Sequence, residues 1–171
     1  MKHPAITLSS LSFISALTLA PVVSHAETPA LIEFKQMSPE TALKAAEAAL
    51  QHCRDQGYQV AVAIVDRSGG LQVFLRDRFA GSHTVTVAQN KAWTSASFKQ
   101  STTEIGKATR AGQAESGIRF VDRVMVNGGG LPVTAAGSLV GAIGVSGAPG
   151  GEADEACAHA GIDVIAEDLE F

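Results

Sequence analysis

The feature that most constrains the fold is a segment with very few side chains. Residues 128–151 hold nine of the 17 glycines of the chain. Flexible linkers are polar, whereas these glycines alternate with apolar residues: Leu131, Val133, Leu139, Val140, Ile143 and Val145. Glycine inside an apolar strand is typical of a bulge or of close approach by another backbone or a flat ligand. Gly141 and Gly144 are an odd number of positions apart, so we expect both faces of this strand to be closely packed.

The same glycines do not match the known phosphate-binding loops. A Walker A motif continues with Lys and then Ser or Thr, and this segment does not. The run "GAIGVSG" spaces its glycines as G-x-x-G-x-x-G within an apolar strand, whereas a dinucleotide fingerprint needs G-x-G-x-x-G between a strand and a helix. The sequence has no basic run of the kind that binds nucleic acid. We therefore expect neither nucleotide nor nucleic acid as a partner.

Residues 1–26 predict a secretory signal peptide. They begin with the basic Lys2, continue with an apolar run, and end with the small residues Ser24 and Ala26 at the −3 and −1 positions. The apolar run is too short to cross about 30 Å of hydrocarbon. We expect cleavage after Ala26, no membrane insertion, and a periplasmic or secreted protein. Residues 27–171 then form a single domain with a net charge of about −5.

The remaining pattern predicts an α+β domain. Ser38 and Pro39 open a helix that Gly57 ends. The other expected elements are a short edge strand over residues 30–34, a hairpin over 58–77, a helix over 83–98, a short helix over 101–110, a second hairpin over 131–147 and an acidic C-terminal helix from 151. Residues 111–127 fit no single element. Together these elements form a five-stranded, mainly antiparallel sheet flanked by helices.

The helix expected over residues 83–98 has no charged face. Its one full charge is Lys91, which indicates that the helix is covered on more than one side. In a domain of this size, the second cover is another subunit or a ligand. A buried ammonium needs an anionic partner. Two interpretations of Lys91 remain open: an ion pair with a protein carboxylate such as Asp66 or Asp77, within or between subunits, and an anionic ligand.

The segment "NGGG" offers a second element of an anion site. Its backbone N–H groups, those of Gly129 and Gly130 included, would form a nest beside Lys91.

The two cysteines are candidates for a disulfide. Cys53 lies on the apolar face of the first helix and Cys157 on that of the last. If the two helices are neighbours, a bridge would close a long loop and stabilise the fold by about 4–5 kcal/mol. Exported proteins favour such bridges. The alternative, two buried small apolar side chains, remains equally open.

Three stretches together resemble a known family. "VAIVDRSGGLQVFLRDRFAGS", "AQNKAWTSASF" and "GGGLPV" followed by "GAIGVSGAPGGEADEACAHAGI" are similar to the GlcG/HbpS-like proteins, described as haem-degrading or haem-binding, and to the C-terminal domain of PduO corrinoid adenosyltransferases. The resemblance covers residues 31–165. It implies a profilin-like α/β/α sandwich, assembly into homo-oligomers, haem as a cofactor and, for some members, a sensor kinase as partner.

The histidines are the candidate haem ligands. A haem site needs an apolar slot, an axial ligand and cations near the propionates. His83, at the start of the uncharged helix, is the candidate ligand of the iron, and Arg76 and Arg78 are candidate carboxylate partners. A capping or surface role is the alternative for His83. His52 is expected at the surface, and His159, among small residues, is expected to be buried.

The sequence matches none of the enzyme motifs considered: a nucleophile elbow, HExxH or a cysteine metal site. The sequence contains no nucleophile elbow and no HExxH, and Cys53 and Cys157 lack metal-ligand spacing. The family resemblance implies the leading hypothesis, an exported, oligomeric haem- or tetrapyrrole-binding protein. An enzyme or accessory protein acting on an organic acid at the surface formed by Lys91 and the glycines is the first alternative. A protein that binds a membrane sensor is the second.

Overall fold

The structure is a computed structural model that describes residues 28–170. The predicted signal peptide lies outside the described residues. Residues 28–33 contain neither helix nor strand, and the folded domain comprises the residues from Phe34 onward. No helix among the described residues has the length and apolar character needed to cross a membrane.

The domain is built from four strands, four α-helices and two short 3-10 helices. The strands are β1 (Ala61–Asp66), β2 (Leu71–Arg76), β3 (Gly130–Ala135) and β4 (Ser138–Ser146). The helices are α1 (Pro39–Asp55), α2 (Thr84–Phe98), α3 (Thr102–Ala108), η1 (Ala114–Phe120), α4 (Gly151–Asp163) and η2 (Glu167–Leu169). The strand order is β2-β1-β4-β3, and every neighbouring pair is antiparallel.

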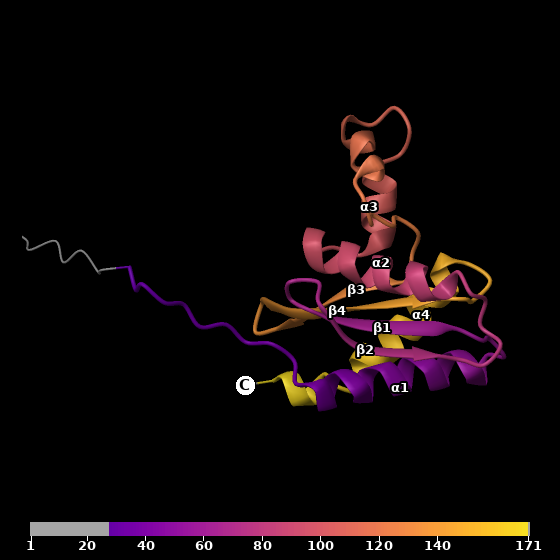
Figure 1. Cartoon of the computed structure of the whole chain (residues 1–171), viewed down its shortest axis with the longest axis horizontal. Helices are drawn as coiled ribbons and strands as arrows, with labels where there is room; N and C mark the ends of the chain where they lie inside the picture. Colours follow the sequence, from indigo (N-terminus) through magenta and orange to yellow (C-terminus); the bar gives the residue numbers. More distant parts are fainter. Residues whose placement is uncertain (1–27, 171) are drawn as a thin grey trace, which may run out of the picture. The chain divides into compact units, whose positions relative to one another are not determined.

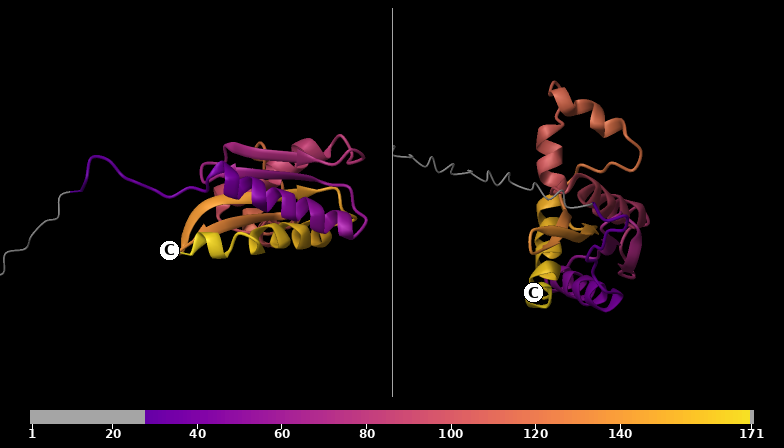
Figure 2. Two further views of the ribbon diagram at one scale, coloured as in Figure 1. Left: turned by 90° about the horizontal axis from the view of Figure 1, so that it is seen from below. Right: turned by 90° about the vertical axis from the view of Figure 1, so that its left-hand side faces the viewer.

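The elements are arranged in three layers. Helices α1 and α4 lie side by side on one face of the sheet, and α2 covers the other face (Figures 1 and 2). Helix α3 and the chain that returns from it extend beyond α2 (Figure 1). The expected α+β architecture, with an antiparallel sheet between helices, is confirmed.

The prediction of a fifth strand is wrong. Residues 30–34 form no strand, and the sheet of the described chain has four strands. The apolar residues Leu31 and Ile32 are adjacent in sequence, so a strand would direct them to opposite faces. Burying only one of them offsets little of the entropy lost when an edge strand is ordered.

Local capping chemistry sets the helix boundaries as expected. The Thr41 amide donates a hydrogen bond to the hydroxyl of Ser38, the N-cap of α1. The Glu104 amide donates to the hydroxyl of Ser101, the N-cap of α3. Each cap satisfies an amide that the helix itself leaves without a partner.

Two apolar layers of different character hold the sheet between its helices. The layer toward α1 and α4 contains the large aliphatic residues of the core, such as Ile64, Val62 and Ile143. The layer toward α2 is built almost entirely from alanine: Ala61, Ala63, Val65, Ala88, Ala92, Ala96 and Ala142. Small side chains in this second layer bring α2 close to the sheet.

The glycines of β4 are required by this close packing. A Cβ on Gly144 would lie 2.2 Å from the Ala88 carbonyl oxygen and 2.5 Å from the Ala92 amide nitrogen, both in α2. A Cβ on Gly141 would instead lie 2.5 Å from the Met37 Cε atom. The two glycines therefore face opposite sides of the sheet, and protein closely approaches each side. This confirms the expectation drawn from their odd spacing.

A disulfide between Cys53 and Cys157 joins α1 to α4. The two sulfur atoms are 2.06 Å apart, and both residues are buried. The helices approach closely at Gly161, where a Cβ would lie 2.6 Å from the Ala45 carbonyl oxygen. The bridge spans 104 residues, which include the whole sheet and α2. It therefore ties the first helix of the domain to the last.

We predict that Gly144→Ala destabilises the domain. The added methyl group meets α2 backbone, which cannot move aside as a side chain can, so we expect a loss of about 2–3 kcal/mol of unfolding free energy in urea titrations. Gly117→Ala is the matched control, because a Cβ there has no neighbour within 4 Å. The control should change stability by no more than about 1 kcal/mol. Equal stability of the two variants would contradict the close approach of α2.

We predict that removing the disulfide lowers stability substantially. A bridge that closes a loop of about 100 residues stabilises the folded state by about 4–5 kcal/mol, because it lowers the conformational entropy of the unfolded chain. The Cys53→Ala/Cys157→Ala variant should therefore unfold at a much lower urea concentration than the oxidised protein. Reductant should shift the parent protein toward the same midpoint and leave the variant unchanged. A parent midpoint that is insensitive to reductant while two free thiols appear would refute this role.

Candidate functional site

The candidate site is a cavity of about 480 Å³, called the site cavity below. One wall is a stripe of α2, formed by His83, Val87 and Lys91, which are spaced four residues apart and therefore share a helix face. The opposite side consists of the end of β4, the turn after it and the first turns of α4. Met125 and Asn127 complete the lining. The volume lies within the range of small-molecule sites.

Lys91 forms the floor of the site cavity with Asp154. The Nζ atom lies 2.7 Å from Asp154 Oδ2 and 2.9 Å from the carbonyl oxygen of Val145, and both side chains are buried. The partner is therefore neither of the expected carboxylates. Asp66 accepts hydrogen bonds from amides of its own turn, and Asp77 pairs with Arg54. Helix α2 crosses β4 toward the start of α4, which places Lys91 against α4 within the same chain.

Burial and the ion pair with Lys91 act on the Asp154 carboxyl in opposite directions. Burial raises the pKa of the Asp154 carboxyl above its ordinary value, and Lys91 and the amide of Ala148 offset part of this increase. With a raised pKa, the folded state binds this proton more tightly than the unfolded chain does. The group therefore favours folding at acidic pH, and this advantage is lost as the pH rises through the raised pKa. The ion pair with Lys91 limits the cost of keeping the carboxylate charged.

Ser146 adds a free polar group beside this pair. The residue is 4% exposed and lines the site cavity. Within residues 28–170, its hydroxyl has no hydrogen-bond partner. The hydroxyl is therefore available to a ligand or to ordered water.

His83 lies at the mouth of the site cavity. It is the N-cap residue of α2, yet its side chain forms no capping hydrogen bond, so the alternative capping role is not seen. The exposed imidazole ring folds against Gly81, where a Cβ would lie 2.7 Å from His83 Cε1. Its ring nitrogens have no partner among the described residues. His83 is exposed, as in the alternative of a surface role, and it lines the same cavity as Lys91.

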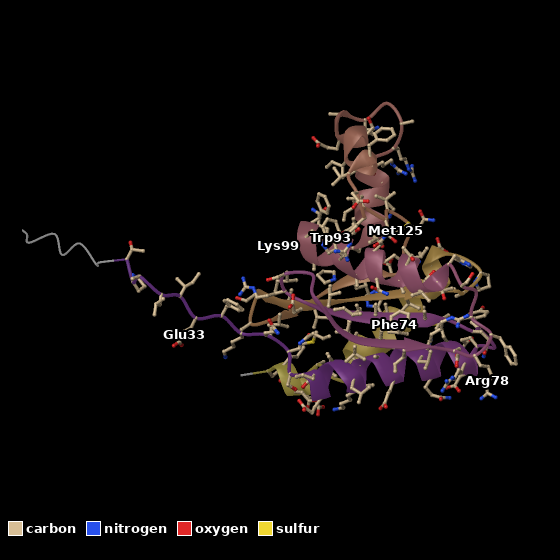
Figure 3. All side chains as sticks on the ribbon, in the orientation of Figure 1. Glu33, Phe74, Arg78, Trp93, Lys99 and Met125 are labelled. Carbon is tan, nitrogen blue, oxygen red and sulfur yellow. A yellow bond between two sulfur atoms is a disulfide. The ribbon has the colours of Figure 1, made fainter. Side chains whose placement is uncertain are left out.

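Arg76 and Arg78 do not line the site cavity. The Arg76 guanidinium donates to the carbonyl oxygen of Ala80. Figure 3 shows Arg78 on the side of the sheet covered by α1 and Met125 on the side covered by α2.

Gly129 and Gly130 do not form the expected anion nest. Their lack of side chains instead allows the backbone to lie close to Lys91. The Gly129 amide donates to Glu155 and the Gly130 amide to the hydroxyl of Thr102. A Cβ on Gly129 would lie 3.1 Å from Lys91 Nζ, and one on Gly130 would lie 2.5 Å from the Lys91 carbonyl oxygen. These glycines therefore allow the chain to pass directly against Lys91. Their amides are occupied by protein acceptors.

His52 and His159, the other two histidines within residues 28–170, lie outside the site cavity. His159 is exposed, so the expectation that it is buried is wrong. Cys157, Ala158 and Gly161 form the inward face of α4, and position 159 falls on the outer face. His52 is half-buried on α1.

Sequence reasoning did not identify Met125, Asn127, Ser146 and Asp154 as site residues. Asp154 belongs to an acidic cluster that helix polarity already explains, and Ser146 ends an apolar strand. Met125 and Asn127 lie in the segment that matched no element. Tertiary packing alone brings these four residues together with Lys91. In the described part of the chain, no group of three or more His, Cys, Asp or Glu side chains is placed to hold a metal ion.

Comparison with known proteins identifies a family and several relatives. Residues 37–163 match the family described as "Haem degrading protein HbpS-like". A double mutant of HbpS from Streptomyces reticuli is 36% identical, with a TM-score of 0.76 over 86% of this chain and 98% of that one. PduOC, solved as a complex with haem, is 28% identical, with a TM-score of 0.71 over 76% of this chain and 95% of that one.

A third relative is the 15.0 kDa protein encoded in the dhaT–dhaS intergenic region of Citrobacter freundii. It is 31% identical over 128 residues, which cover 74% of this chain and 89% of the relative. The family match spans the layered domain from Met37, just before α1, to the end of α4. This chain belongs to the HbpS-like family of haem-degrading proteins.

Proposed function

We propose that this protein binds haem, or a related tetrapyrrole, in the site cavity. The observation that carries the proposal is the free imidazole of His83 at the mouth of a cavity with apolar residues in its lining, in a member of the HbpS-like family. A haem-bound relative, PduOC, supports it. Neutral imidazole is a common axial ligand of haem iron.

The residues of the site cavity fit such a ligand. Val87, Met125 and Ala148 supply apolar contacts for a macrocycle, and His83 supplies a nitrogen ligand. Lys91 and Asp154 neutralise each other, so the floor adds no net charge against an apolar ring. When bound, haem would supply the redox chemistry of its iron. The protein's own contribution is to hold the ring and set the polarity around it.

An organic acid is the weaker candidate for this cavity. Its expected anchor was Lys91, but Asp154 and the Val145 carbonyl already accept two of the ammonium's hydrogen bonds. The amides of Gly129 and Gly130 are also occupied. A small carboxylate would have to compete with an internal carboxylate for the same cation. Nothing in the geometry favours that exchange.

Export and self-association complete the proposal. The signal-like residues 1–26 and the buried disulfide support an oxidising compartment such as the periplasm. The exposed aromatic residues Phe79 and Phe120, 79% and 91% accessible, support contacts between copies of the chain. A membrane sensor as partner stays a prediction from the family resemblance.

We predict that the purified protein binds haemin saturably with a shifted Soret band. His83→Ala should weaken binding by about tenfold or more, because one iron ligand is lost, and the band position should change. His159→Ala is the control, since His159 is an exposed imidazole on α4 that lies outside the cavity. A spectrum that remains that of free haemin would reject haem binding. A His83→Ala variant identical to the control would reject only this choice of ligand.

We predict that the buried pair beneath the proposed ligand is structural. Lys91→Met leaves the Asp154 carboxylate buried without its cation, which should cost about 3–5 kcal/mol of unfolding free energy. Lys91→Met/Asp154→Leu removes both charges and should recover most of that loss. Urea unfolding measures both. A single variant as stable as the parent would show that the pair does not hold α2 against α4.

A further inference from the structure

A second cavity, of about 370 Å³, adjoins the site cavity. It is lined by α3, by Arg119 of η1, by residues 126–128 and by the first turn of α4. Asn127 and Gly151 line both cavities, so the two are neighbours across a shared wall. We call the second one the basic cavity because Lys107, Arg110 and Arg119 line it, against the single acidic residue Glu152.

The cations of the basic cavity are not neutralised within the protein. Lys107 and Arg110 are exposed, and neither has a hydrogen bond or ion pair with any described residue. Arg119 donates through Nε to the Thr109 carbonyl oxygen and through Nη2 to the Gly106 carbonyl oxygen. These acceptors are uncharged, so the guanidinium keeps its full charge and its remaining donors.

The fold keeps these side chains around one hollow. Thr103, Gly106, Lys107 and Arg110 recur at a spacing of three and four residues, which places them along one side of α3 and its C-terminal turn. A Cβ on Gly106 would lie 2.3 Å from the Val126 carbonyl oxygen. The returning chain therefore packs directly on α3 at this glycine. Arg119 fastens the η1 segment to the same turn.

The site cavity itself lacks a cation for an acidic ligand. Its lysine is paired with Asp154, and Arg76 and Arg78 are not part of its lining. Haem carries two carboxylate groups at one edge of an apolar ring. We propose that the basic cavity holds these carboxylates, with Lys107 and Arg110 as their partners, while the ring occupies the site cavity. This inference rests on the proposed function and replaces Arg76 and Arg78, the carboxylate partners expected from the sequence, with Lys107 and Arg110.

The test compares haemin with its dimethyl ester, which has the same iron and ring without the two negative charges. Lys107→Gln/Arg110→Gln should bind haemin about tenfold more weakly than the parent, because two exposed ion pairs are lost. Binding of the dimethyl ester should be unchanged. The difference between the two ligands in the parent protein should shrink as salt is raised.

The matched control is Arg78→Gln/Lys99→Gln, which removes two exposed cations outside both cavities. It should bind both ligands as the parent does. If Lys107 and Arg110 serve only to stabilise α3, their variant will unfold at lower urea and keep the parent's preference for haemin over the ester. That outcome, or equal haemin binding by the two double variants, would overturn the inference. Failure of the parent to bind either ligand would instead reject the proposed function.

Discussion

The structure depends on the direct contact of α2 with β4. The backbone of Gly144 lies against the backbone of α2, and an alanine layer fills the rest of this interface. Such close packing leaves no room for a larger side chain, because protein interiors are already packed to the density of organic crystals. It also brings Lys91 to the end of β4, where a bulkier strand would hold it away. Both the fold and the position of Lys91 in the site therefore require glycine at this contact.

The ion pair between Lys91 and Asp154 forms the floor of the site cavity. The pair connects α2 to the first turn of α4, and Asp154 also accepts from the Ala148 amide. A buried pair is weak support for stability by itself, because desolvation offsets much of its attraction. The pair has two roles here. Through the bond from the Ala148 amide to Asp154 it holds the turn after β4 in place, and it makes the floor of the cavity electrically neutral. An apolar ring can then lie above it.

In the proposed binding mode, the two neighbouring cavities would hold different parts of one amphipathic ligand. The site cavity offers an imidazole, apolar lining residues and a neutral floor, whereas the basic cavity offers exposed cations on α3, just after it and on η1. Solvated cations can meet ligand carboxylates without the cost of burying a charge, and a buried apolar wall suits the ring. The proposal would give a role to α3 and its returning chain, which add no residue to the two core clusters of the domain.

The sequence alone determined the order of the four α-helices and the two hairpins, the caps of α1 and α3, and the closely packed faces of β4. These features follow from short-range chemistry and from the spacing of glycines such as Gly141 and Gly144. The sequence also singled out His83 and Lys91. Tertiary structure decided the partner of Lys91, since many carboxylates are available along the chain and only packing selects Asp154. It likewise decided the disulfide, the loss of the fifth strand and the joining of Met125, Asn127 and Ser146 into one cavity. Contacts between residues far apart in sequence leave no periodic trace, so the pattern of a single chain does not reveal them.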